Sequence, residues 1–185
     1  MKKILLLAIV VILSAGIQKS FAQEKNVTKS EKKAQKQKFE DAQWNQLKQI
    51  IDDKQFVFRG NILNSTKGTT TLNPKINFVS IQGDRALVQM ASGFGGGQNG
   101  IGGYTIDGLI ENYSVKTKGV GKGININFTV MPRVGQGVDS QPINININAF
   151  SFDSARLSIG SGSTSMQGDI STNADAKIFE GNTPN

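Results

Sequence analysis

The sequence predicts a mainly β protein, built as a single antiparallel β-barrel or strongly curved sheet with one N-terminal α-helix. Short segments in which apolar and polar residues alternate recur from Phe56 to Ile170, and Gly and Asn residues interrupt them. No helical pattern separates these segments, and consecutive strands without intervening helices pair antiparallel. A helical spacing of apolar residues occurs just before the first strand segment. Together these observations predict a lipocalin-like barrel.

The first 22 residues have the layout of a secretory signal peptide. Two Lys residues follow Met1, residues 4–12 are all apolar, and small residues at Ser20 and Ala22 precede a cut before Gln23. The apolar run is shorter than the roughly 20 residues that cross a membrane. We therefore expect export to the periplasm or beyond, with no lipid anchor because the chain has no Cys, and no membrane span in the mature chain.

The mature chain is expected to start with a polar lead and then fold as one domain. Residues 23–38 are mostly Lys, Gln, Glu, Ser and Asn, which offer little surface to bury, so they predict a flexible lead or a frayed helix. From residue 39 the spacing of Trp44, Leu47 and Ile51 predicts one apolar stripe of a helix that ends near Asp52. Residues 39–185 are expected to form a single barrel-like domain with this helix at its N-terminus.

Two long segments give the clearest strand patterns. Residues 124–130 and 143–148 alternate strictly, so their apolar side chains share one face and their Asn side chains the other. We expect the Asn face to be the wet outside, the alternative being the polar lining of a cavity. Two further predicted strands, residues 76–82 and 85–90, are separated by Gly83-Asp84, which predicts a tight hairpin. The remaining predicted strands are residues 56–58 and 109–116, and the hairpin of 155–159 with 164–170.

Composition excludes several classes of chemistry. The chain has no His and no Cys, which rules out disulfides, imidazole or thiolate metal sites, and every Cys- or His-based catalytic group. After loss of the leader, 18 basic and 14 acidic residues remain, and both kinds are spread along the chain. Nucleic-acid binders concentrate their basic residues on one face, so we expect no nucleic-acid partner. We also expect no cofactor and no metal.

A Gly-rich segment between two predicted strands is the least ordinary part of the sequence. It formally contains the pattern GxGxxG, but a strand rather than a helix follows it, and no acidic residue stands about 20 positions further on. Nucleotide binding is therefore not expected. A loop whose aromatic ends gate a ligand site is the hypothesis that we carry forward. Its residues are Phe94, Gly95, Gly96, Gly97, Gly100 and Tyr104.

Asp107 and Glu111 are the nearest pair of acidic residues in the predicted barrel. On one strand they would share a face but lie about 13 Å apart, which exceeds the separation of about 5–9.5 Å in glycosidase pairs. A hydrolase would need two carboxylates, or a Ser and a Lys, brought together in a cleft. Pairing between strands could still bring acidic residues together, which would make a hydrolase, but the expectation is a protein without enzymatic activity.

The order of these features resembles the uncharacterised bacterial secreted family known as domain of unknown function 4251. The resemblance runs from about Phe39 to Phe179, through the helix, the Gly83-Asp84 turn, the Gly-rich segment, Tyr113 and the two alternating strands. This family resembles lipocalin-type barrels, which implies the same fold here, and it implies no activity. Where many members carry a Leu-Pro-Tyr-like stretch before the Gly-rich turn, this chain has Ala91-Ser92-Gly93-Phe94.

The function expected from these features is non-enzymatic binding of a small, partly apolar ligand in the mouth of the barrel, because barrels of about eight strands can hold one small ligand. An interior filled with side chains would contradict it. The alternative is a structural or interaction protein of the cell envelope that docks on a partner protein or polymer. That alternative predicts a solid core and an exposed apolar patch.

Overall fold

The computed structural model describes residues 28–91, 99–133, 141–160, 162 and 164–181. The expected signal peptide and Phe94 to Gly97 of the expected gating loop lie outside these residues. The chain divides into two units, Met1–Lys38 and Phe39–Asn185. Each is described by itself.

Helix α2 (Lys29–Asp52) begins ten residues before residue 39, inside the segment expected to be a flexible lead or a frayed helix. The reason is a capping box at its first turn. The N–H of Thr28 donates to Oε2 of Glu31 at 2.8 Å, and the N–H of Glu31 donates to Oγ1 of Thr28 at 3.3 Å. All the described residues of the first unit are exposed, so its helical conformation is supported by this cap and not by burial.

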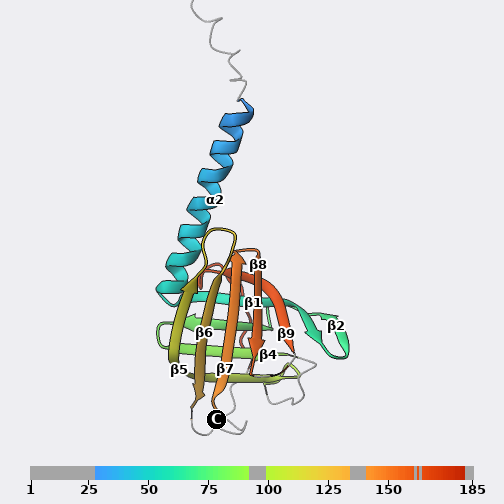
Figure 1. Cartoon of the computed structure of the whole chain (residues 1–185). Coiled ribbons are helices and arrows are strands. Elements are labelled where there is room, and N and C mark those ends of the chain that lie inside the picture. Colours follow the sequence, from blue (N-terminus) through green and yellow to red (C-terminus); the bar gives the residue numbers. More distant parts are fainter. Residues whose placement is uncertain (1–27, 92–98, 134–140, 161, 163, 182–185) are drawn as a thin grey trace, which may run out of the picture. The chain divides into compact units, whose positions relative to one another are not determined.

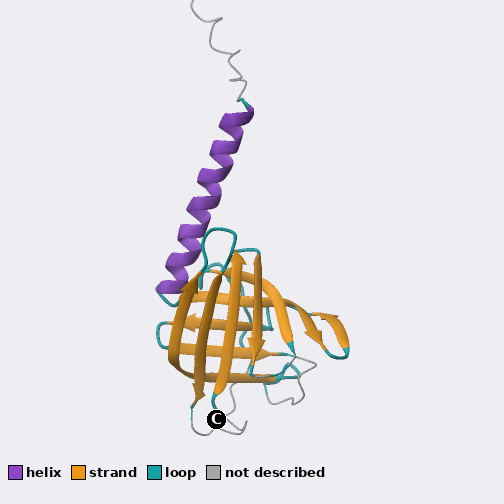
Figure 2. Cartoon of the chain, in the orientation of Figure 1, coloured by secondary structure: helices purple, strands orange, loops and turns teal. Residues whose placement is uncertain are grey.

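The second unit contains an eight-stranded antiparallel barrel, which confirms the predicted fold class (Figures 1 and 2). Each barrel strand pairs with the next one along the chain, and the last strand pairs with the first to close the sheet. The barrel strands are β1 (Gln55–Ser65), β3 (Phe78–Gln82), β4 (Arg85–Met90), β5 (Tyr104–Thr117), β6 (Ile124–Pro132), β7 (Ile143–Ser151), β8 (Ser154–Ile159) and β9 (Ser165–Ser171).

The hairpins follow the turn chemistry of the sequence. Gln82 pairs with Arg85 across Gly83-Asp84, and Gly83 adopts the positive φ of 63° that such a turn requires. The short strand β2 (Gly68–Thr71) pairs with the last residues of β1, and the two form a hairpin that leaves the barrel wall (Figure 1). All four residues of β2 are exposed. Because β2 has no apolar alternation, its sequence gave no strand signal.

One end of the barrel is closed by residues of α2 and is called the helix end here. Trp44, Leu47 and Ile51 belong to the same buried cluster as the inward-facing residues of the strands. Tyr113 of β5 donates its hydroxyl to the carbonyl oxygen of Ile51 at 2.6 Å. Since β1 starts three residues after α2, the antiparallel order places the end of β1, at Ser65, at the opposite end of the barrel.

An irregular C-terminal segment, residues 172–181, covers the outer face of β1, β3 and β4. Ala176 is fully buried against Val57 and Phe78, which point away from the barrel interior. Arg59 donates from Nη1 to the carbonyl oxygen of Ala176 at 3.0 Å, and Asn173 donates to that of Ile81 at 3.0 Å. These hydrogen bonds fix the position of the irregular segment along the outer face of the sheet.

Within the described part of the chain, every helix is too short or too polar to span a lipid bilayer.

Candidate functional site

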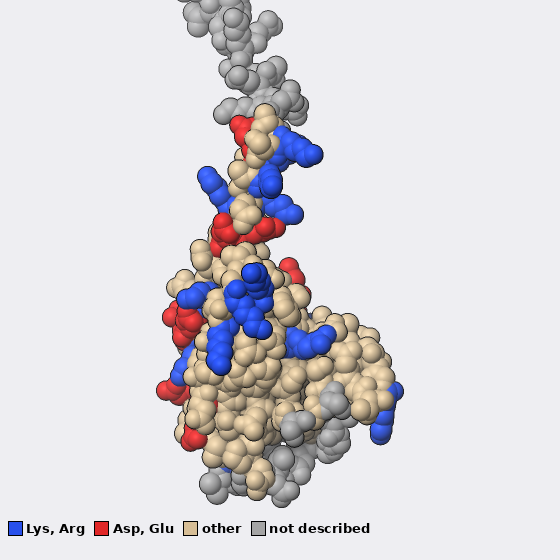
Figure 3. Space-filling view, in the orientation of Figure 1, with Lys and Arg blue, Asp and Glu red and all other residues tan. Residues whose placement is uncertain are grey.

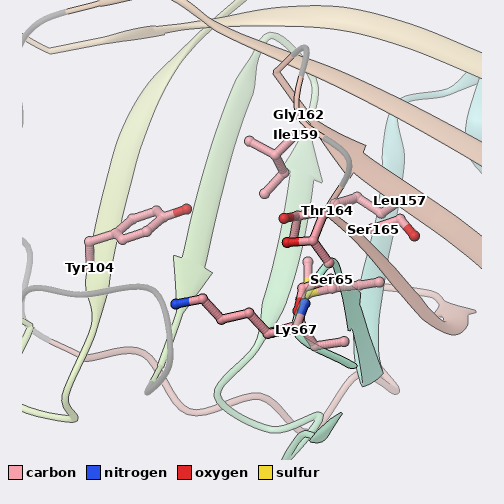
Figure 4. A pocket seen from close by; sticks show the side chains of 11 residues that line it. Ser65, Lys67, Tyr104, Leu157, Ile159, Gly162, Thr164 and Ser165 are labelled. Atoms are coloured by element: carbon pink, nitrogen blue, oxygen red, sulfur yellow. The ribbon is translucent and has the colours of Figure 1, made fainter. Parts of the chain in front are cut away.

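A cavity of about 400 Å³ opens at the end of the barrel opposite α2, which is called the cavity end here. Its volume falls in the range of about 300–1,000 Å³ that is usual for small-molecule sites. Strands β1, β5, β8 and β9 and the two turns between neighbouring strands supply its walls (Figure 4). The lining residues are Leu63, Ser65, Thr66, Lys67, Tyr104, Leu157, Ile159, Gly162, Thr164, Ser165 and Met166.

Strand register makes the floor of this cavity apolar. Met166 of β9 pairs with Leu157 of β8 on one side and with Leu63 of β1 on the other. All three side chains are buried and point inward, so they form one contiguous apolar surface across three strands. A ligand resting on this floor would bury its own apolar surface, which is worth roughly 25 cal/mol per Å².

The rim of the cavity is polar. Moving from the floor toward the mouth, the inward positions of β1 and of the β8–β9 connection carry Ser65 and Thr164. Figure 4 shows the side chains of Thr164 and Tyr104 extending toward the same space from opposite sides of the cavity. The site therefore joins an apolar floor to a ring of hydroxyl groups, which suits a ligand with one apolar and one polar end.

Below the floor, the barrel interior is filled with side chains. Phe58, Val88, Ile126 and Ile147 are fully buried between the cavity and the helix end. A filled interior is what the docking alternative predicts, and the space left for the expected ligand is at the mouth and does not extend along the whole barrel.

Two of the expected gating residues, Gly100 and Tyr104, lie in the described part of the chain, and the structure separates them. Tyr104 begins β5, is half buried and lines the cavity. Burial raises the pKa of its phenol above the ordinary value, so the group is neutral at physiological pH. Gly100 lies in the turn before β5 and does not line the cavity.

Asn99 holds that turn in place and was missed by the sequence analysis. Its side chain is buried, and its Oδ1 accepts the N–H groups of Ile101 at 3.1 Å and Gly103 at 3.0 Å. Its Nδ2 lies 3.3 Å from Oγ1 of Thr105, which itself bonds Oε1 of Gln89 at 3.1 Å. A single Asn inside a Gly-rich segment is a signal for such a side-chain turn. The turn that precedes Tyr104 is therefore anchored to the outer face of β4 and β5.

A Ser and a Lys do meet in this cleft, but their arrangement does not favour nucleophilic catalysis. The hydroxyl of Ser65 donates to the carbonyl oxygen of Gly68 and accepts the N–H of Lys67, both at 3.2 Å, so it stabilises the β1–β2 turn. The Lys67 side chain is exposed. A lysine that acts as a general base needs a desolvated setting that lowers its pKa. Ser65 and Lys67 therefore do not form a catalytic pair, and the cavity offers groups that can bind a ligand.

The carboxylate of Asp107 forms ion pairs with two arginines. It accepts two bonds from Arg85, both at 2.6 Å, and lies 3.4 Å from Nη1 of Arg133. This bond to Asp107 raises the pKa of Arg85. Glu111 is exposed, so the two acids do not form a catalytic pair. Among the described residues, no group of three acidic side chains could hold a metal ion.

The Asn side chains of β6 and β7 lie on the outer face of the barrel, as the alternation predicts. Asn144 is exposed, whereas Asn125, Asn127, Asn146 and Asn148 are half buried and form a closed ring of amide hydrogen bonds. Around this ring Asn125 donates to Asn148, Asn148 to Asn146, Asn146 to Asn127, and Asn127 back to Asn125, with distances of 2.5–2.9 Å. These amides satisfy one another, and they do not belong to the lining of the cavity at the cavity end.

Comparisons with known proteins agree with this architecture. A family model described as Domain of unknown function (DUF4251) matches residues 25–170. The crystal structure of a DUF4251 family protein from Bacteroides eggerthii DSM 20697 at 1.95 Å resolution is similar, with 22% sequence identity and a TM-score of 0.51. The similarity covers 71% of this chain and 88% of that chain, and it concerns the fold alone. No curated protein matches this chain.

Proposed function

The chain belongs to the DUF4251 family, and we propose that it is an exported envelope protein that binds a small, partly apolar ligand at the cavity end of its barrel without transforming it. The observation that carries the proposal is the cavity of about 400 Å³ with an apolar floor and a hydroxyl rim.

Export is part of the proposal and is supported by the leader-like residues 1–22. Binding without catalysis is supported by the pairing of Asp107 with arginines and by the bonds that commit Ser65 to its turn.

Native mass spectrometry of the mature protein, purified from the envelope of its own host, tests the proposal. We expect a discrete extra mass that is released when the same sample is denatured. A cavity-filling variant, Thr164→Trp, should lose the extra mass because the new ring occupies the mouth. The matched variant Thr71→Trp, on an exposed position of β2, should keep it. Apo protein in every wild-type preparation would contradict the proposal.

The alternative function, docking on an envelope partner, is favoured by a specific feature of the helix end. Val120 and Phe150 are 48% and 47% exposed, and both border an apolar hollow of about 290 Å³ beside Trp44 and Leu47. Exposed Lys118 and Lys122 flank Val120, and Lys and Arg side chains gather toward this end of the barrel face in Figure 3.

The same mass spectra test this alternative. A stoichiometric protein complex in place of a small extra mass would support docking, provided that Phe150→Ser abolishes it. Phe179→Ser is the matched control, because Phe179 is also exposed but lies on the C-terminal segment. A complex that survives Phe150→Ser would contradict docking at the helix end.

A further inference from the structure

We infer that the ligand of the cavity end is a small anionic amphiphile, a carboxylate with one short apolar tail, whose charged group pairs with Lys67. This inference rests on the proposed function, because it assigns the ligand class of the same cavity.

Charge is the first observation behind it. Among the residues that line the cavity, Lys67 is the one with an ionised side chain, and none of the lining residues is acidic. Figure 4 shows its amine extending along the mouth, on the side of the cavity where the Tyr104 ring lies. A ligand with a cationic group would meet repulsion here, and an anion would gain an ion pair at the rim.

Hydrogen-bond donors at the rim suit a carboxylate. The hydroxyl of Thr164 lies at an inward position of the rim and can donate to a carboxylate oxygen. A carboxylate oxygen can accept several bonds at once, and such charge-assisted bonds are stronger than neutral ones. The rim thus offers both the Lys67 cation and the neutral hydroxyl of Thr164 to the same group.

The floor determines the other end of the ligand. Leu63, Leu157 and Met166 form the contiguous apolar floor of the cavity, and Met is well suited to adapt to irregular ligands. At about 30 Å³ for each non-hydrogen atom, a volume of about 400 Å³ admits a ligand of little more than a dozen such atoms. Because the interior below the floor is filled, a long acyl chain does not fit.

Octanoate and its neutral isostere octanamide are the probes that test this inference, since they share one tail and differ in charge. Their dissociation constants would be measured at pH 7 and low salt by amide chemical-shift titration of the folded protein. Octanoate should bind about two- to fivefold more tightly than octanamide, the preference expected of an exposed ion pair. Lys67→Gln should abolish this preference, so that octanoate and octanamide bind this variant with equal affinity.

Lys75→Gln is the matched control. Lys75 is exposed near the same end of the barrel but does not line the cavity, so its loss removes an equal charge without touching the site. The preference should persist in this variant. Equal loss in both variants would show a general electrostatic effect and overturn the role of Lys67.

The remaining outcomes separate this inference from the proposed function. Equal binding of octanoate and octanamide at the cavity end would overturn the anionic ligand class but keep a partly apolar ligand. Binding of neither probe to the wild-type protein would overturn the amphiphile inference, while a different extra mass in the native spectra would still support ligand binding.

Discussion

The two ends of the barrel are built from the same alternating strands, yet they are finished differently. At the helix end, Trp44, Leu47 and Ile51 join the core, and Tyr113 bonds the last turn of α2. The ring of Tyr113 also lies 5.1 Å from the amine of Lys54. At the cavity end, the inward positions near the mouth are held by smaller polar residues such as Ser65 and Thr164, and a hollow remains between them.

This difference separates stability from binding within one sheet. Side chains that fill the helix end bury apolar surface and gain dispersion contacts, as in any close-packed core. The cavity end forgoes part of that stabilisation, which is the usual cost of a site that must admit another molecule. The comparison therefore predicts that substitutions at the helix end act on folding, whereas those at the cavity end act on binding.

The largest expected effect is that of Leu47→Ala at the helix end. Leu47 is 1% exposed and packs into the core, so its truncation should lower the free energy of unfolding by about 3 kcal/mol. Chemical denaturation measures this value. Phe39→Ala, on the same helix but 64% exposed, should change it by less than about 0.5 kcal/mol. Similar small losses in both variants would show that α2 does not close the barrel.

The second largest effect is expected at alkaline pH, which should lower the free energy of unfolding through Tyr113 at the helix end. Burial, and to a lesser extent the charge of Asp52, raise the pKa of Tyr113 above the value of about 10 for an unfolded chain. The unfolded state therefore loses its proton first, and the stabilisation, which is complete below pH 10, declines as the pH rises further.

The expected slope is about 1.4 kcal/mol per pH unit for this tyrosine. Denaturation of the wild-type protein and of Tyr113→Phe should be compared between about pH 9 and 11.5. Tyr113→Phe should show the shallower slope, and Tyr104, whose pKa is also raised, should account for part of what remains. Identical slopes in the two proteins would contradict the account of Tyr113.

The smallest expected effect on stability is at the cavity end. Thr164→Val keeps the shape of a partly exposed rim residue and removes its hydroxyl. The free energy of unfolding should change by less than about 0.5 kcal/mol, as for other substitutions away from a packed core. Thermal or chemical denaturation would detect a larger loss, and a loss close to that of Leu47→Ala would remove the distinction between the two ends.

The strand pattern of this chain could be predicted because each strand has one buried face. The alternation at residues 124–130 and 143–148, the Gly83-Asp84 turn and the stripe of Trp44, Leu47 and Ile51 are local signals, and the structure confirms them. The start of α2 had a local signal too, the capping box of Thr28 and Glu31, which was overlooked.

The site itself was predictable only in part. Tyr104 was expected at a ligand site and lines the cavity, but Leu63, Leu157 and Met166 come together only through strand register. The pairing of Asp107 with Arg85 likewise joins two strands, and the C-terminal segment is held by bonds to backbone carbonyls. None of these long-range contacts leaves a periodic pattern in the sequence.

The central claim, an accessible apolar hollow at the cavity end above an interior filled with side chains, can be tested without knowing the ligand. Xenon enters apolar cavities, so methyl-resolved NMR of the protein under xenon pressure reports where such space exists. The account predicts shifts at the methyl groups of Leu63, Leu157 and Met166, and none at Ile81 or Val88 in the filled interior. Shifts confined to Ile81 and Val88, or none at the cavity end, would contradict it.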